Sequence, residues 1–98
     1  MNTLQSRWLD LYLGTSAWSW VYADEEHSTY LVRNPISDYY YVVTFGPDLA
    51  RITESLYDEP DHKELEELLE DESLVSTHDM REEIQKEIDD LKNLLLMY

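Results

Sequence analysis

The residues with the clearest chemical potential are carboxylates repeated at helical spacing in the second half of the chain. Acids three or four positions apart on a helix lie roughly 5–6 Å from one another. Phosphates along a nucleic-acid strand are spaced on a similar scale, so a row of such carboxylates could fill a groove lined with Lys and Arg. Two rows have this spacing: Glu64, Glu66, Glu67, Glu70 and Asp71 form the first, and Glu83, Glu87 and Asp90 the second.

The acids are unevenly distributed as well as numerous. The 98 residues include 22 Asp and Glu against 7 Lys and Arg, a formal net charge of −15. Sixteen of the acids lie in residues 54–90, where only three basic residues accompany them. Repulsion among like charges lowers the stability of the folded state. These residues form either an ordinary solvated surface or, as the sharper hypothesis, a surface that binds a basic protein.

Motifs for catalysis and for cofactor binding are absent from the sequence. Its two glycines cannot form a glycine-rich phosphate loop, and without cysteine it has no disulfide and no thiolate metal site. His27, His62 and His78 have polar neighbours; His78 and Glu82 are four positions apart, but two ligands rarely make a metal site. Residue content does not exclude a Ser/His/Asp triad, yet no nucleophile elbow frames a serine. We expect no catalytic residue, no metal and no cofactor, and hence a protein that is not an enzyme.

The elements that position the acidic rows are predicted from the period of the apolar residues. Apolar residues at helical spacing predict a helix over residues 3–13, ended by Gly14. Over residues 17–45 the period changes to two, which predicts three short antiparallel strands. The strongest of these by propensity is YYYVVTF at residues 39–45.

Helices are predicted for most of the chain after residue 45. The Gly-Pro-Asp sequence at residues 46–48 is typical of a helix start, and Leu49, Ile52 and Leu56 would form the apolar stripe of that helix. Capping patterns at Asp61 and Asp79 predict helices over residues 61–71 and 79–97, with a linker over 73–78. The predicted fold is therefore one α+β domain over residues 1–98. It has a small three-stranded antiparallel sheet, an N-terminal helix and two to three C-terminal helices, the last two strongly acidic.

The many aromatic residues of the predicted sheet are the second candidate for partner contacts. Trp18, Trp20 and Tyr22 are expected on one face of their strand, and the sheet has more rings than a single face needs. Surplus Tyr and Trp are common anchors at interfaces. Tyr30 and Tyr40 are the rings that we expect to be exposed.

A heptad pattern in the last helix is the third candidate. Ile84, Ile88, Leu91 and Leu95 form a seam that Leu94, Leu96 and Met97 widen. Because two heptads are short for a coiled coil, we expect this face to cover the sheet. The alternative is a homodimer formed through the seam.

A basic, nucleic-acid-binding protein is the partner that this charge fits. In size, acidity and lack of cysteine the chain resembles phage inhibitors of CRISPR and restriction systems, several of which imitate DNA. It also resembles immunity proteins and antitoxins that block basic nucleases, and it has no residues diagnostic of either group. We expect a phage-encoded inhibitor of the anti-CRISPR or anti-restriction type. The alternatives are an immunity protein or antitoxin against a nuclease toxin, and an adaptor module that dimerises through its last helix.

The charge and the hydropathy pattern also bear on location. Direct binding to nucleic acid or to an anionic membrane is not expected, because the protein has the wrong sign of charge. No apolar run is long enough to span a bilayer, and the first fourteen residues lack the pattern of a signal peptide. We therefore expect the protein in the cytoplasm, that of the host bacterium if it is phage-encoded.

Overall fold

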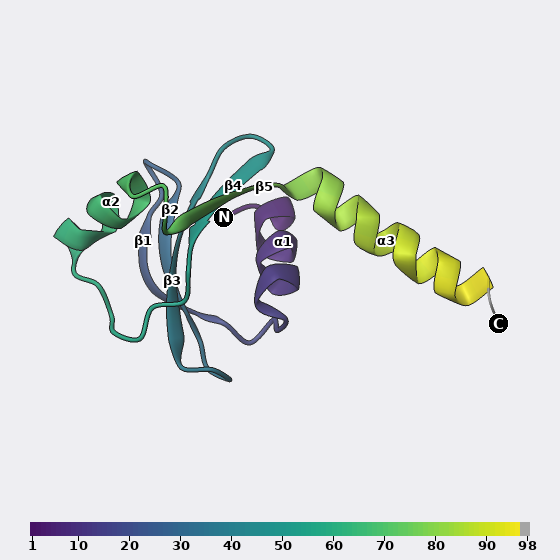
Figure 1. Cartoon of the computed structure of the whole chain (residues 1–98), viewed down its shortest axis with the longest axis horizontal. Helices are drawn as coiled ribbons and strands as arrows, with labels where there is room; N and C mark the ends of the chain where they lie inside the picture. Colours follow the sequence, from purple (N-terminus) through teal and green to yellow (C-terminus); the bar gives the residue numbers. More distant parts are fainter. Residues whose placement is uncertain (97–98) are drawn as a thin grey trace.

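The fold is α+β, with one antiparallel sheet and helices on both of its faces (Figure 1). The computed structural model describes residues 1–96. Five strands follow one another across the sheet in chain order, β1-β2-β3-β4-β5, so that β1 and β5 form its edges. In chain order the elements are α1 (Thr3–Leu13), β1 (Ser19–Asp24), β2 (Thr29–Asn34), β3 (Tyr39–Phe45), β4 (Leu49–Thr53), α2 (His62–Glu70), β5 (Val75–Asp79) and α3 (Met80–Leu96).

Two segments that the sequence pattern assigns otherwise are strands. The helix expected after residue 46 is wrong: the amide of Gly46 donates to the carbonyl of Leu49 (2.8 Å) and closes a hairpin that pairs Phe45 with Ala50. Most of the linker expected over residues 73–78 belongs to β5, an edge strand with few apolar residues to reveal it. The sheet therefore has five strands rather than three, and the two C-terminal helices, which agree with the expected two to three, are separated by β5.

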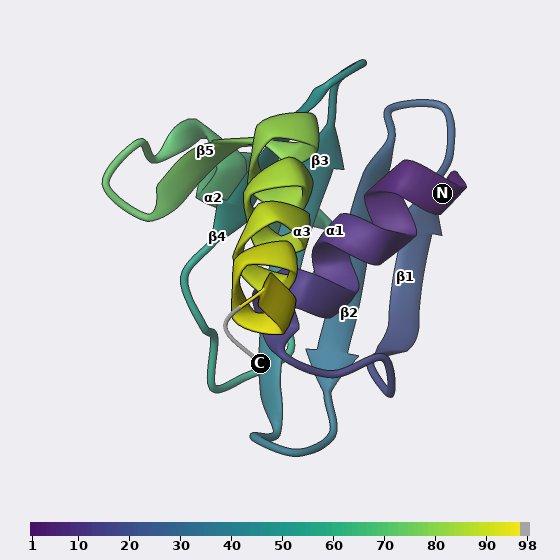
Figure 2. The same ribbon diagram turned by 90° about the vertical axis from the view of Figure 1, so that its right-hand side faces the viewer.

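Each face of the sheet has its own hydrophobic core, because successive residues of a strand point to opposite sides. Figure 2 shows α1 and α3 in front of the sheet and α2 behind it. On the α1 face, Trp8 and Leu9 pack on the strands, with these residues: Tyr30, Val32, Val43, Phe45, Ala50, Ile52 and Met80. On the other face, Leu65 of α2 packs on Leu31 and Val42. Two cores explain why the strands carry more rings than one face needs.

A β-bulge divides the aromatic residues of β1 between the two faces. Trp20 pairs with Val32 but Tyr22 pairs with Leu31, so one extra residue is inserted between them. Trp18 contacts the core on the α1 face, whereas Tyr22 contacts the core under α2. The expectation that Trp18, Trp20 and Tyr22 share a face is therefore wrong, because a bulge shifts the two-residue period.

Helix α3 does not cover the sheet, contrary to the expectation from its heptad pattern. Met80 is buried and Ile84 packs beside it on the α1-face core. Beyond Ile84 the helix diverges from the sheet, with α1 beside its first turns, and every described residue from 85 onward is exposed (Figure 1). The domain is correspondingly elongated, with extents of 50 × 28 × 25 Å. Met97, which the pattern includes in this helix, lies outside the described residues.

The two-core arrangement predicts a large contrast between two isoleucine substitutions. Ile52→Ala empties a fully buried site in β4 and should lower the free energy of unfolding by about 2–5 kcal/mol. Ile36→Ala alters the turn between β2 and β3, where the side chain is 76% exposed, and should change it by less than about 0.5 kcal/mol. Urea unfolding followed by tryptophan fluorescence measures both. An equal loss of unfolding free energy in the two variants would contradict the burial of Ile52 in β4.

Candidate functional site

Helix α2 holds the first acidic row rigidly on the sheet. At its start, Asp61 accepts hydrogen bonds from the amides of Lys63 (3.0 Å) and Glu64 (2.9 Å), which is the N-cap that the sequence predicts. At its end, the guanidinium of Arg51 in β4 donates to the carbonyl of Leu69 (3.0 Å). Both ends of the helix are therefore fixed.

The outer side of α2 consists of carboxylates. Leu65, Leu68 and Leu69 pack on the sheet, as their spacing predicts. The acids of the row all lie on the exposed side and are named here the α2 acidic face: Glu64, Glu66, Glu67, Glu70 and Asp71. Within residues 1–96 none of the five takes part in an ion pair, although Asp71 accepts hydrogen bonds from Ser73. Lys63 is the single basic residue of the helix sequence.

The second acidic row lies on the other side of the sheet (Figure 1). Glu83, Glu87 and Asp90 of α3 share a groove of about 370 Å³ between α1 and α3. The groove is also lined by Trp8, Leu11, Tyr12 and Lys86. The structure thus places each predicted row on one side of its helix but does not join the two rows into a single surface.

Glu83 is used for a structural contact within the domain. One oxygen of its carboxylate accepts a hydrogen bond from Nε1 of the buried Trp8 (3.0 Å), and the other lies 2.8 Å from Nδ1 of His78. The ring of His78 also packs against the rings of Trp8 and Tyr12. The contact joins α1, β5 and α3. The i, i+4 spacing suggests that His78 pairs with Glu82, but in the structure its partner is Glu83.

Ser76 extends this contact into a chain with the connectivity of a hydrolytic triad. Its Oγ lies 2.7 Å from Nε2 of His78, whose other nitrogen contacts Glu83. Acyl transfer also needs donors that converge on an oxyanion, and the amide of the nucleophilic serine is one that serine proteases use. In the β4–β5 ladder, the two-residue period of the hydrogen bonds directs the amides of Ser76 and His78 toward β4. We therefore interpret the chain of contacts as packing of α3 on β5.

The predicted aromatic anchors are not free side chains. Tyr30 is only 2% exposed, because β2 lies inside the sheet and this residue faces α1; its expected exposure is wrong. Burial raises the pKa of Tyr30 to about 12, and the hydrogen bond from its hydroxyl to Glu25 (2.9 Å) acts in the same direction. Tyr40 is half-buried against the core under α2.

An exposed tyrosine that the sequence pattern did not single out lies just before α2. Tyr57 is 79% exposed, and its ring meets that of Tyr39 edge to face (centroids 5.1 Å apart). It directly precedes the Asp58-Glu59-Pro60 segment that leads into the helix. A tyrosine within a polar, proline-containing stretch is a signal that could have identified it as a surface residue.

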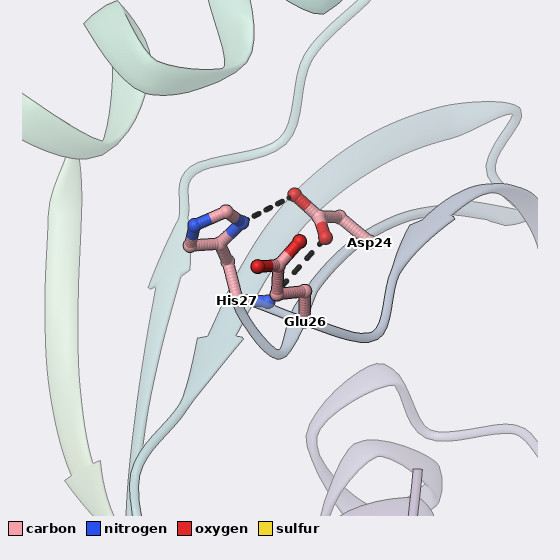
Figure 3. A group of neighbouring side chains, drawn as sticks. All are labelled: Asp24, Glu26 and His27. Atoms are coloured by element: carbon pink, nitrogen blue, oxygen red, sulfur yellow. Dashed lines mark hydrogen bonds and ion pairs between the residues drawn. The ribbon is translucent and has the colours of Figure 1, made fainter.

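Three titratable side chains gather on the turn between β1 and β2 (Figure 3). Nδ1 of His27 lies 2.8 Å from Asp24, whose carboxylate also accepts a bond from the His27 amide (3.3 Å). The hydrogen bond with Asp24 raises the pKa of His27, and the charges of Asp24, Glu26 and Glu66 raise it further. The same hydrogen bond lowers the pKa of Asp24. Asp24, Glu26 and His27 could approach one cation, but they come from one tight turn and His27 and Glu26 are exposed, so they do not form an enclosed metal site.

The remaining predicted histidine, His62, lies close to this turn. A hollow of about 240 Å³ between the β1–β2 hairpin and α2 is lined by His27, His62, Tyr22 and Glu66, among others. The ring of His62 stacks on that of Tyr22, with centroids 4.2 Å apart. His62 therefore has an aromatic contact at the start of α2.

The seam residues of α3 are divided by the edge of the domain. Ile84 is half-buried in the α1-face core, whereas Ile88, Leu91 and Leu95 are exposed. These three are therefore not used for packing within the described residues.

Comparison with known proteins identifies no relative. No protein-family model, no curated protein and no solved structure matches this chain. Among residues 1–96, no helix is both long and apolar enough to cross a bilayer. The chemistry of the surfaces described above is therefore the basis for assigning a function.

The contacts of His78 predict that it matters for stability more than the other histidines do. His78→Ala removes the packing of the ring on Trp8 and Tyr12 and one partner of the partly exposed Glu83, and should lower the free energy of unfolding by about 0.5–2 kcal/mol. His27→Ala, at a fully exposed turn, is the matched control and should have little effect. Thermal and urea unfolding measure the difference. Similar stabilities for the two variants would show that the contact with Glu83 does not hold α3.

The β1–β2 turn predicts a specific pH dependence. Because folding raises the pKa of His27 above its usual 6.5, the contribution of this pair is fully present below pH 6.5 and is lost as the pH rises through the folded-state pKa. On the acid side it is lost as the pH falls through the lowered pKa of Asp24. An NMR titration of the histidine ring protons should give a raised pKa that Asp24→Asn returns toward 6.5. A His27 pKa that this substitution leaves unchanged would refute the pairing.

Proposed function

We propose that this protein is a non-catalytic inhibitor that binds a basic, nucleic-acid-binding protein through the α2 acidic face. The observation that carries the proposal is the row of five exposed carboxylates on one rigid helix, with no ion pair to any of them within the described residues. The target class that fits is a bacterial defence protein of the CRISPR or restriction type, and the inhibitor would be phage-encoded.

The energetic cost of this face supports a role beyond solubility. Glu66 and Glu70 are like charges four positions apart on α2, and Glu67 lies three positions from both Glu64 and Glu70. Each such pair destabilises a helix by a few tenths of a kcal/mol. Interspersed lysines would keep the surface soluble without that cost. A basic partner would remove the repulsion on binding, so that stability lost in the free protein is regained in the complex.

The geometry of α2 also suits imitation of a nucleic-acid backbone. Neighbouring carboxylates on one side of a helix are roughly 5–6 Å apart, a scale similar to the spacing of phosphates. The N-cap at Asp61 and the bond from Arg51 hold the helix in place before binding. Charges that are held in place lose less entropy on association than charges on a mobile loop do.

The proposal is tested first in cells and then with purified components. The protein is expressed in bacteria that carry one CRISPR or one restriction system, and phage plating is measured for each system. Restored plating in one system identifies the target, whose binding to labelled target DNA is then titrated with the protein. The protein should displace that DNA while binding no DNA or RNA itself in a gel shift. Neutralisation of a co-encoded nuclease toxin, with no effect on any defence system, would favour the immunity-protein alternative.

Once the target is identified, charge removal from α2 should slow association. The triple variant Glu64→Gln, Glu67→Gln and Glu70→Gln should lower the on-rate at least about threefold at low salt, because complementary charge accelerates encounter. The control variant Glu82→Gln, Asp89→Asn and Asp90→Asn removes three charges from α3, on the other side of the sheet, and should lower it much less. Stopped-flow association at two ionic strengths measures both.

The stability of the α2 variant separates a binding role from a folding role. Its thermal midpoint should be unchanged or higher, since the substitutions relieve repulsion within the helix. On-rates that are equal for the two variants, or that do not depend on salt, would show that α2 is only a solvated surface.

A further inference from the structure

Helix α3 carries its apolar stripe out of the domain and into solvent. The stripe begins in the α1-face core, where Met80 is fully buried and Ile84 is packed. Along the same side of the helix the exposed fraction then rises from 41% at Ile88 to 55% at Leu91 and 76% at Leu95. Leu94 and Leu96 are also exposed. An apolar surface that continues a core in this way usually marks a site of association.

The charges beside the stripe favour a second copy of the same helix as its occupant. Ile84, Ile88, Leu91 and Leu95 occupy the inner positions of a heptad pattern, and Glu87 and Lys92 flank them. These flanking residues are five positions apart. In a parallel pair of helices, residues with this relation face each other across the seam. Glu87 of each copy would therefore pair with Lys92 of the other, which gives two ion pairs.

The distribution of charge explains why two acidic proteins could associate here. Residues 54–79 contain eleven acids and one lysine, whereas residues 81–96 contain five acids and three basic residues. The weakly charged α3 projects from one side of the sheet and the strongly charged α2 lies on the other (Figure 1). Pairing through α3 therefore places the weakly charged helices at the interface and leaves the strongly charged α2 helices outside it.

We propose that the protein forms a homodimer by parallel pairing of the exposed part of α3, with Ile88, Leu91 and Leu95 in the seam and Glu87–Lys92 pairs at its sides. Ile84 is committed to its own domain, so the seam is short. The association is accordingly weak and depends on protein concentration. The inference does not depend on the proposed inhibitory function.

Sedimentation equilibrium of the full chain tests the dimer over concentrations from about 1 µM to about 1 mM, the range of weak associations. Leu91→Asp buries an unpaired charge in the seam and should raise the dissociation constant at least about tenfold. Asn93→Asp is the matched control: it adds the same charge on the opposite side of the helix and should leave association nearly unchanged. Because position 91 is exposed in the monomer, both variants should melt like the wild type in dilute solution.

The orientation is tested by exchanging the flanking charges. Glu87→Lys and Lys92→Glu should each weaken the dimer, and the double variant should restore it, since only the signs of the paired charges are exchanged. A monomer at every concentration would overturn the proposal, as would a dimer that Leu91→Asp leaves intact. Failure of the double variant to restore association would overturn the parallel pairing.

Discussion

The carboxylate of Glu83 is the contact on which the arrangement of the α1 side of the molecule depends. Trp8 is buried at the centre of that core, and the N–H of a buried indole needs an acceptor. Glu83 supplies it and at the same time contacts His78, so a single side chain fixes α1, β5 and the first turn of α3 relative to one another. Together with the burial of Met80 and the packing of Ile84, this contact holds the start of α3 on the α1 side of the sheet, opposite α2. The exposed carboxylates of α2 and the exposed apolar stripe of α3 therefore lie on opposite sides of the sheet.

The sequence pattern predicted most reliably those elements in which local signals agree with the final packing. The helices at residues 3–13 and 61–71 combine an apolar stripe with caps, and residues 39–45 combine β-branched and aromatic residues; all three segments form as expected. The acidic side of α2 was predictable for the same reason: Leu65, Leu68 and Leu69 define its inner side, and all the other positions of the helix are polar or charged.

The errors arise where a distant segment decides the local structure. Leu49 and Ile52 suit a helix as well as a strand, and only pairing with β3 and β5 makes them a strand. β5 is an edge strand with few apolar residues and is stable because β4 provides its hydrogen bonds. The bulge in β1 places Tyr22 on the other face, and Tyr30 is buried because β2 is an inner strand, which its own sequence does not reveal. For α3, the heptad pattern correctly identifies an apolar stripe, but the pattern alone does not distinguish packing on the sheet from exposure.

The sheet between the two cores has a consequence for how this protein can change over generations. Within residues 1–96 the core under α2 and the core under α1 are separate clusters with no residue in common, and distant sites contribute to stability nearly independently. Substitutions on α2 can therefore accumulate without disturbing the contact between Trp8 and Glu83 or the direction of α3. If the proposed function holds, a target that alters its basic groove could be followed by mutation of one helix alone. Selection on the α1 side would meanwhile act only on folding and on the position of α3.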